Sequence, residues 1–190
     1  MSWGTLDSLR YYDQEAYLFE DVHKRFQADG VLSAFDFFSI VIWKANRAKS
    51  KVAHRLLKMA EAEDLDGAVR QLSGSLFKAE TPKERLRILL KDWGFLLPMS
   101  SAVLSVLWPD DFTVYDIRVC DELGDFHRLG NWSLFDKIWS TYEKYCQAVQ
   151  AAGPEGLSLR GKDRFLWARS AAQQLERDIA GCFGKFPGPS

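Results

Sequence analysis

Residues 93–123 contain the clearest structural signals in the chain. The segment reads WGFLLPMSSAVLSVLWPDDFTVYDIRVCDEL, in which Gly94 and Pro98 bracket a short turn and WPDD ends the apolar run that follows. Glycine adopts the left-handed conformation that commonly ends a helix, and proline is favoured in a helix's first turn. The segment therefore predicts a helical hairpin with a buried second helix, an extended connector over residues 112–115, and a new helix that starts after Asp116.

Helical spacing of apolar residues dominates the rest of the chain, and no stretch alternates with period two for long enough to require a strand. A buried strand remains the alternative for residues 37–43, where flanking alanines favour helix. The fold class is predicted to be all-α. The predicted helices cover residues 11–26, 34–49, 65–72 (ended by Gly74), 82–93, 98–107, a stretch from Asn131 or Ser133 to 152, and 159–179.

The last predicted helix has a definite inward and outward face. Its inward residues are expected to be Phe165, Leu166, Ala168 and Leu175. Its outward residues are expected to be Arg160, Lys162, Arg164 and Arg169.

The composition indicates a globular protein with a large core, since 47% of the 190 residues are hydrophobic. The net charge of -1 favours no class of partner. Three widely spaced cysteines, Cys120, Cys146 and Cys182, fit the reduced thiols of a cytoplasmic protein. Neither they nor the histidines have metal-ligand spacing, so no metal site is predicted. We expect no signal peptide at the start of the chain and no membrane-spanning helix.

A basic run occupies the region before the acidic residue Glu61. Its members are Lys44, Arg47, Lys49, Lys51, Arg55 and Lys58. A solvated helix face is the simplest interpretation. A phosphate-binding surface is the alternative, favoured because the chain as a whole is slightly acidic and its positive charge is concentrated here.

The hairpin and Asp116 together suggest a chemistry. The first amides of the second hairpin helix lack intrahelical acceptors and suit a phosphate group without reading sequence. A carboxylate further along the chain suits attack on a sugar, because it stabilises positive charge at the anomeric carbon or orients a water. Aspartate is also among the best helix N-caps, so capping alone explains Asp116, and the two roles are compatible.

This segment resembles the helix-hairpin-helix DNA glycosylase superfamily, in which a glycine-rich hairpin and a small-residue helix precede an aspartate in a V-D-x-x-V context. The matching positions are Gly94, residues 100–104, Pro109, Phe112, residues 116–119 and Leu123. Weaker similarities at Trp43-Lys44 and residues 159–167 extend the likeness loosely to roughly two thirds of the chain.

The resemblance implies a two-lobed helical bundle in a single domain, residues 1–190. Its lobes would be roughly residues 30–125, with the hairpin at 82–107, and residues 1–29 plus 126–182, followed by a tail at 183–190. It also implies that Asp116 is the catalytic residue and that the backbone near residues 95–100 holds DNA phosphate.

Further site residues follow from the basic run and from the aromatic residues around the connector. The candidate DNA-binding residues are Gly94, Phe95, Leu97, Met99, Ser100, Arg118, Lys44, Arg47, Lys49 and Lys51. The candidate base-pocket residues are Trp43, Trp108, Tyr115 and Trp167, for which a place in the core is the alternative. For Arg118 the alternative is a surface ion pair with Asp121 or Glu122. For Lys44 the alternative is a residue at the edge of the core, with a buried aliphatic chain and a solvent-exposed ammonium group.

The sequence also departs from the family pattern. Leu96 stands at the place of the hairpin's second glycine, and Pro98 stands where bifunctional members carry a nucleophilic lysine. Its neighbours Leu97 and Met99 are no nucleophiles either, and the cysteine cluster of some members is absent. The resemblance therefore implies a monofunctional enzyme without lyase activity.

The predicted function is excision of a flipped, modified or damaged base from double-stranded DNA, which leaves an abasic site in DNA repair or anti-phage defence. Oxidised purines and alkylated bases are the usual family targets, and a likeness to anti-phage glycosylases adds glucosylated hydroxymethyl-cytosine. No cofactor is expected, although the resemblance allows a structural monovalent cation at the hairpin. No membrane and no obligate protein partner is expected. A non-catalytic DNA-binding module and a helical protein–protein interaction domain are the alternatives.

Overall fold

A computed structural model describes residues 8–184, and the ends of the chain, residues 1–7 and 185–190, lie outside this range. Only helices and loops occur among the described residues, which confirms the all-α class. The chain divides into two compact units, Met1–Val114 (unit 1) and Tyr115–Ser190 (unit 2). Most of the expected tail at 183–190 lies outside the described range.

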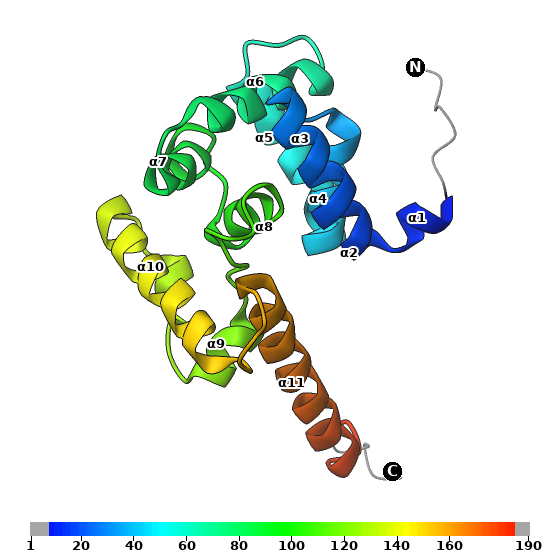
Figure 1. The fold of residues 1–190 in the computed structure, drawn as a ribbon, viewed down its shortest axis with the longest axis vertical. Coiled ribbons are helices and arrows are strands. Elements are labelled where there is room, and N and C mark those ends of the chain that lie inside the picture. The colour runs from blue at the N-terminus through cyan, green and yellow to red at the C-terminus, as the bar shows by residue number, and fades with distance from the viewer. Residues whose placement is uncertain (1–7, 185–190) are drawn as a thin grey trace, which may run out of the picture. The chain divides into compact units, whose positions relative to one another are not determined.

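In unit 1 the other helices are arranged around one apolar helix, α8 (Leu97–Leu107; Figure 1). In chain order it contains α1 (Ser8–Tyr12), α2 (Gln14–Ala16), the π-helical η1 (Tyr17–Val22), α3 (His23–Asp29), α4 (Ala34–Ala45), the 3₁₀-helical η2 (Asn46–Ala48), α5 (Lys49–Met59), α6 (Leu65–Lys78), α7 (Pro82–Arg87), the π-helical η3 (Ile88–Asp92) and α8 (Leu97–Leu107).

The central helix is α8, which contacts α3, α4 and α7. Every residue of α8 except Pro98 is buried, as predicted from a helix of apolar and small residues that carries no charge. Two side chains of α3 meet its C-terminal end: His23 Nδ1 lies 3.1 Å from the Val106 carbonyl, and Gln27 Nε2 donates to the Leu107 carbonyl at 2.7 Å. These contacts satisfy carbonyls that have no partner within the helix.

The N-terminal segment belongs to unit 1, whereas residues 1–29 were expected to join the C-terminal lobe. The ring of Phe26 is fully buried and meets Phe77 and Trp108 edge-on, with centroid separations of 5.5 and 5.2 Å. Helix α3 thus packs, through Phe26, against the segments that come just before and just after the hairpin. This packing places the N-terminal segment in unit 1. The boundary between the two units follows Val114, inside the connector, whereas the expected boundary between the lobes was near residue 125.

Local capping signals place most helix ends where the sequence predicts them. Ser33, Thr81 and Asp116 are N-caps whose side chains accept backbone hydrogen bonds, and Gly30 and Gly94 are left-handed.

Several predicted helix boundaries are wrong. The helix predicted over residues 34–49 ends at Ala45, and a separate helix, α5, begins at Lys49. The helix predicted over residues 11–26 is divided into several segments, the last of which ends at Asp29.

The helix expected to stop at Gly74 continues to Lys78, because burial of Leu72 and Leu76 outweighs the cost of about 1 kcal/mol for a helical glycine. The helix expected to begin at residue 131 or 133 begins at Phe135.

Unit 2 contains α9 (Ile117–Leu123), the 3₁₀-helical η4 (Leu129–Asn131), α10 (Phe135–Ala152) and α11 (Leu159–Ala180) (Figure 1). Helix α9 packs on α11, and α10 contacts both. The centre of the unit holds the stacked rings of Tyr142 and Tyr145, 6.0 Å apart, together with Val149 and Leu166.

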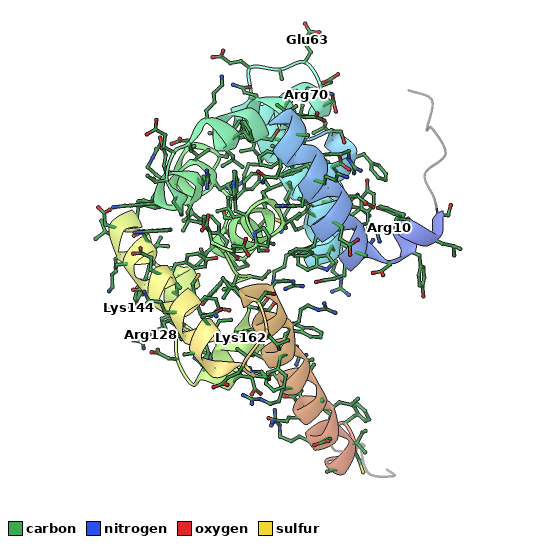
Figure 2. All side chains as sticks on the ribbon, viewed as in Figure 1. Arg10, Glu63, Arg70, Arg128, Lys144 and Lys162 are labelled. Atoms are coloured by element: carbon green, nitrogen blue, oxygen red, sulfur yellow. The ribbon has the colours of Figure 1, made fainter. Side chains whose placement is uncertain are left out.

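The faces of α11 differ from the prediction. Leu166 is buried as expected, but Phe165, Ala168 and Leu175 are exposed. Lys162, expected outward, is buried and donates through Nζ to the Gln150 carbonyl (Figure 2). The buried residues of α11 are Lys162, Asp163, Leu166 and Ser170, and none of them lies in the last ten residues of the helix. The helix therefore packs through one short stripe. Three of the four residues in this stripe are polar or charged, so the spacing of apolar residues does not predict it.

Among residues 8–184, no helix combines the length and the apolar character that crossing a membrane requires.

Candidate nucleic-acid interface and candidate catalytic carboxylate

The hairpin turn of unit 1 runs from the end of η3 to the start of α8. Gly94 adopts a φ of 63°, and the Phe95 amide donates to the Leu89 carbonyl at 2.8 Å. Leu96 follows as the N-cap of α8, with 71% of its surface exposed and no side-chain capping bond. The left-handed glycine thus reverses the chain and leaves the start of α8 uncapped at the tip of the turn.

Few amides at this tip remain unused. Those of Met99 and Ser100 donate to the Leu96 carbonyl at 3.0 and 2.9 Å, and Pro98 has no N–H. The amides of Leu96 and Leu97 make no hydrogen bond within residues 8–184. Two consecutive donors at the positive end of an 11-residue helix suit an anionic oxygen.

Four of the residues predicted to contact DNA in this turn offer no exposed side chain. The side chains of Phe95, Leu97, Met99 and Ser100 are buried, and the Ser100 hydroxyl has no hydrogen-bond partner in the described part of the chain. The amides of Phe95, Met99 and Ser100 are already bonded. Leu96, which the sequence analysis did not assign, is the exposed residue at the tip. The sequence signal that could have identified Leu96 is its position, because the glycosylases that this segment resembles have the second glycine of the hairpin there.

Helix α5 carries the basic run on its surface. Val52 and Leu56 anchor the helix in the core, and its first turn contains no acid. The exposed basic side chains here are Arg47, Lys49, Lys51, His54, Arg55 and Lys58. Lys44, at the end of α4, is half-buried.

Arg55 connects this basic run to the hairpin. A Cβ added to Gly94 would lie 2.9 Å from Arg55 Nη1, so the guanidinium lies directly against the glycine. Only a residue without a side chain leaves room for this contact. The run on α5 and the turn at Gly94 to Leu97 are therefore parts of one surface of unit 1, which we call the hairpin surface.

Asp116 lies at the start of unit 2. It has extended backbone angles, is half-buried, and accepts through Oδ1 from the Arg118 amide at 3.1 Å. The hydroxyl of Tyr145 is hydrogen-bonded to the Asp116 backbone. The carboxylate is thus held at the first turn of α9 without being enclosed in the core.

Arg118 does not pair with either acid considered for it. Asp121 lies 2.9 Å from His127, and Glu122 pairs with Arg169. The Arg118 guanidinium instead lies 5.7 Å from the centroid of the Trp167 ring.

Two of the four candidate pocket aromatics differ in burial. Tyr115 is 5% exposed and belongs to the core, the alternative considered for it, and burial raises the pKa of its hydroxyl to about 12. Trp108 is half-buried, with the Arg85 guanidinium 3.9 Å from its ring centroid and the Phe26 ring packed against it in a T-shaped arrangement. Tyr115 is therefore the weaker candidate for a base pocket, and Trp108 remains a prediction.

The other two candidate aromatics reach the surface of their units. Trp43 is half-buried with its edge against Phe19, at 5.6 Å between centroids. Trp167 is 46% exposed. They remain candidates for contact with a base.

The three cysteines are free thiols. Burial raises the pKa of Cys120 to about 11, so this thiol stays protonated at neutral pH. Within the described range, no three His, Cys, Asp or Glu side chains are grouped so as to hold a metal ion.

Comparison with protein-family models, with curated proteins and with solved structures found no match to this chain.

Proposed function

We propose that the protein is a monofunctional DNA N-glycosylase. The observation that carries the proposal is the contact of Arg55 with the left-handed Gly94, next to the unbonded amides of Leu96 and Leu97. The guanidinium of Arg55 on α5 and two amides of the adjacent turn form a site for a phosphate oxygen.

Binding is assigned to the hairpin surface. A phosphate of the DNA backbone accepts from the turn amides, and Arg47, Lys49, Lys51 and Arg55 neutralise its neighbours along the strand. Such contacts position a duplex without reading its sequence, and the affinity they supply falls steeply with salt. Readout of the modified base is then left to other residues, for which Trp43 and Trp167 are candidates.

Catalysis is assigned to Asp116. Once the target nucleotide leaves the stack, its C1′–N bond breaks, and the bonding electron pair departs with the base. The carboxylate stabilises the positive charge that develops on the deoxyribose, orients the water that attacks C1′ and accepts the proton that this water loses, while the departing base takes up a proton from solvent. Pro98 stands where an amine nucleophile would be needed, so the product is an intact strand with an abasic site.

A non-catalytic DNA-binding module is the second candidate. The bond from the Arg118 amide to Asp116 favours it, because this bond is all that a helix N-cap requires. Under this alternative the hairpin surface binds DNA and no base is released.

The decisive experiment compares bases released from a panel of oxidised, alkylated and glucosylated phage DNAs, measured by mass spectrometry. Asp116→Asn keeps a good capping residue but loses the charge, so base release should fall at least about a hundredfold while DNA affinity is retained. Asp64→Asn is the matched control, since Asp64 caps α6 through the Gly67 amide in the same manner. It should leave base release unchanged.

Equal base release by the wild type and Asp116→Asn would remove the catalytic assignment. No release from any DNA, with duplex binding intact, would favour the binding module. Borohydride trapping tests the monofunctional prediction separately, because a covalent protein–DNA adduct requires an amine nucleophile.

A further inference from the structure

Unit 2 contains a cleft of about 560 Å³ that neither the hairpin surface nor Asp116 contributes to. Its walls are the loop of residues 124–129, Trp132, and the side chains of Thr141 and Lys144 on α10. The volume lies within the range of about 300–1,000 Å³ that is usual for small-molecule sites.

The loop wall of the cleft is held in a strained conformation. Phe126 has a φ of 70°, a left-handed angle that is unfavourable for a residue with a side chain. The Tyr115 hydroxyl donates to the Phe126 carbonyl at 2.9 Å and accepts from the Gly130 amide at 3.2 Å. The Asp125 carboxylate accepts from the Phe126 amide at 2.6 Å. Strain that is held by such contacts is characteristic of binding and active sites.

Two cations from different elements face the cleft. Arg128 precedes η4, and Lys144 lies on α10; both are exposed, and Figure 2 labels them beside α10. Neither has an ion-pair partner among residues 8–184. The acids nearby are already engaged, since Asp125 bonds the loop amide and Asp121 bonds His127. Two unpaired cations that line one cleft from different segments suit an anion such as a phosphate group.

The rest of the lining is suited to a flat ring. Trp132 lines the cleft and is half-buried, and Lys137 Nζ lies 4.1 Å from its ring centroid. An indole face stacks on any nucleobase, and the Thr141 hydroxyl can donate or accept a hydrogen bond beside it.

We propose that this cleft binds a phosphate-bearing nucleotide, with the phosphate between Arg128 and Lys144 and the base against Trp132. The nucleotide is either free or part of a nucleic-acid strand, since both present the same chemistry. This site is additional to the proposed glycosylase function and does not depend on Asp116.

The test uses the full-length protein and measures binding of 5′-dCMP, deoxycytidine and inorganic phosphate by calorimetry. The nucleotide should bind at one site per chain and at least tenfold more tightly than deoxycytidine. Arg128→Ala combined with Lys144→Ala should weaken nucleotide binding tenfold or more, and Trp132→Leu should weaken 5′-dCMP more than inorganic phosphate. Arg128→Lys keeps the charge without the guanidinium fork and should lie between the wild type and the double variant.

The control is Lys78→Ala combined with Arg177→Ala, which removes two exposed cations outside the cleft and should change nothing. A single-stranded oligonucleotide that binds more tightly than 5′-dCMP, with the same loss in the double variant, identifies a strand site; equal affinities identify a free-nucleotide site. The proposal fails if 5′-dCMP shows no saturable binding at millimolar concentration. It also fails if the double variant and the control bind it equally.

Asp116→Asn should leave nucleotide binding unchanged, because Asp116 does not line the cleft. Loss of base release with intact nucleotide binding, or the reverse, therefore separates this proposal from the proposed enzymatic function.

Discussion

The hairpin surface of unit 1 and the cleft of unit 2 are both suited to phosphate, but they differ in what supplies the contacts. At the hairpin the donors are main-chain amides at a helix start, reinforced by Arg55. At the cleft they are the side chains of Arg128 and Lys144, and the main chain supplies only the strained loop that carries one of them.

This difference has consequences for specificity. Amides at an exposed tip accept any phosphate along a duplex, and the contacts depend on backbone conformation more than on residue type. A walled cleft with an indole limits the size of what it binds and requires particular side chains. We therefore expect duplex binding to depend on unit 1 and nucleotide binding on unit 2.

The largest expected effect is on duplex affinity. Replacing Lys49, Lys51 and Arg55 by glutamate should weaken duplex DNA binding at least about a hundredfold and reduce the salt dependence, because each lost phosphate contact lowers the slope of log K against log salt by roughly 0.9. Fluorescence anisotropy between 50 and 200 mM salt is the measurement.

The matched comparison is the Arg128→Ala and Lys144→Ala double variant, which should bind duplex with the wild-type salt slope. Equal losses in the two variants would mean that both surfaces contact the duplex. An unchanged affinity in the triple variant would leave the interaction-domain alternative as the simplest explanation of the fold.

The next effect concerns the loop of the cleft. Tyr115→Phe removes the hydroxyl that holds Phe126 and Gly130, so the free energy of unfolding should fall by about 2 kcal/mol. Tyr12→Phe, at an exposed tyrosine, should have no effect. Urea denaturation at neutral pH measures both changes.

The stability difference between the wild type and Tyr115→Phe should also depend on pH. The Tyr115 pKa is raised to about 12 in the folded protein, so above pH 10 the hydroxyl ionises first in the unfolded chain. The stabilisation is complete below pH 10 and is lost as the pH rises towards 12. A difference that stays constant across this range would mean that Tyr115 is accessible to hydroxide in the folded state.

The smallest effect distinguishes two left-handed glycines, one in each unit. Gly94 and Gly124 have φ values of 63° and 68°, so alanine at either position should cost about 1 kcal/mol of stability. Only at Gly94 does the new Cβ meet another residue, Arg55; at Gly124 nothing lies within 4 Å.

Gly94→Ala should therefore displace the guanidinium and weaken duplex binding about threefold, a modest share of the 1.5–3 kcal/mol of a charge-assisted hydrogen bond. Gly124→Ala should reduce the stability of the protein but leave duplex binding unchanged. Urea denaturation and fluorescence anisotropy on the same two variants provide the comparison, and equal duplex affinities would remove Arg55 from the hairpin surface.

Several features of the two units are determined by residues that are close together in the chain. Thr81, Gly94 and Asp116 act on their own neighbouring amides or turns, so their capping roles follow from the order of residues. The exposed basic run on α5 follows from helical spacing in the same way. These features involve residues within a few positions of one another, and they were predicted correctly.

Only the tertiary structure decided which of these local features act together. The contact of Arg55 with Gly94, the burial of Lys162 and the hydrogen bonds from Tyr115 to the loop around Phe126 join residues that are 11 to 39 positions apart. The burial of Tyr115, the contact of Arg85 with the Trp108 ring, and the cleft between the loop and α10 arise in the same way. Side-chain packing between distant segments selects one helix face or one loop conformation among several that the local sequence permits equally well, and helical periodicity carries no information about that choice.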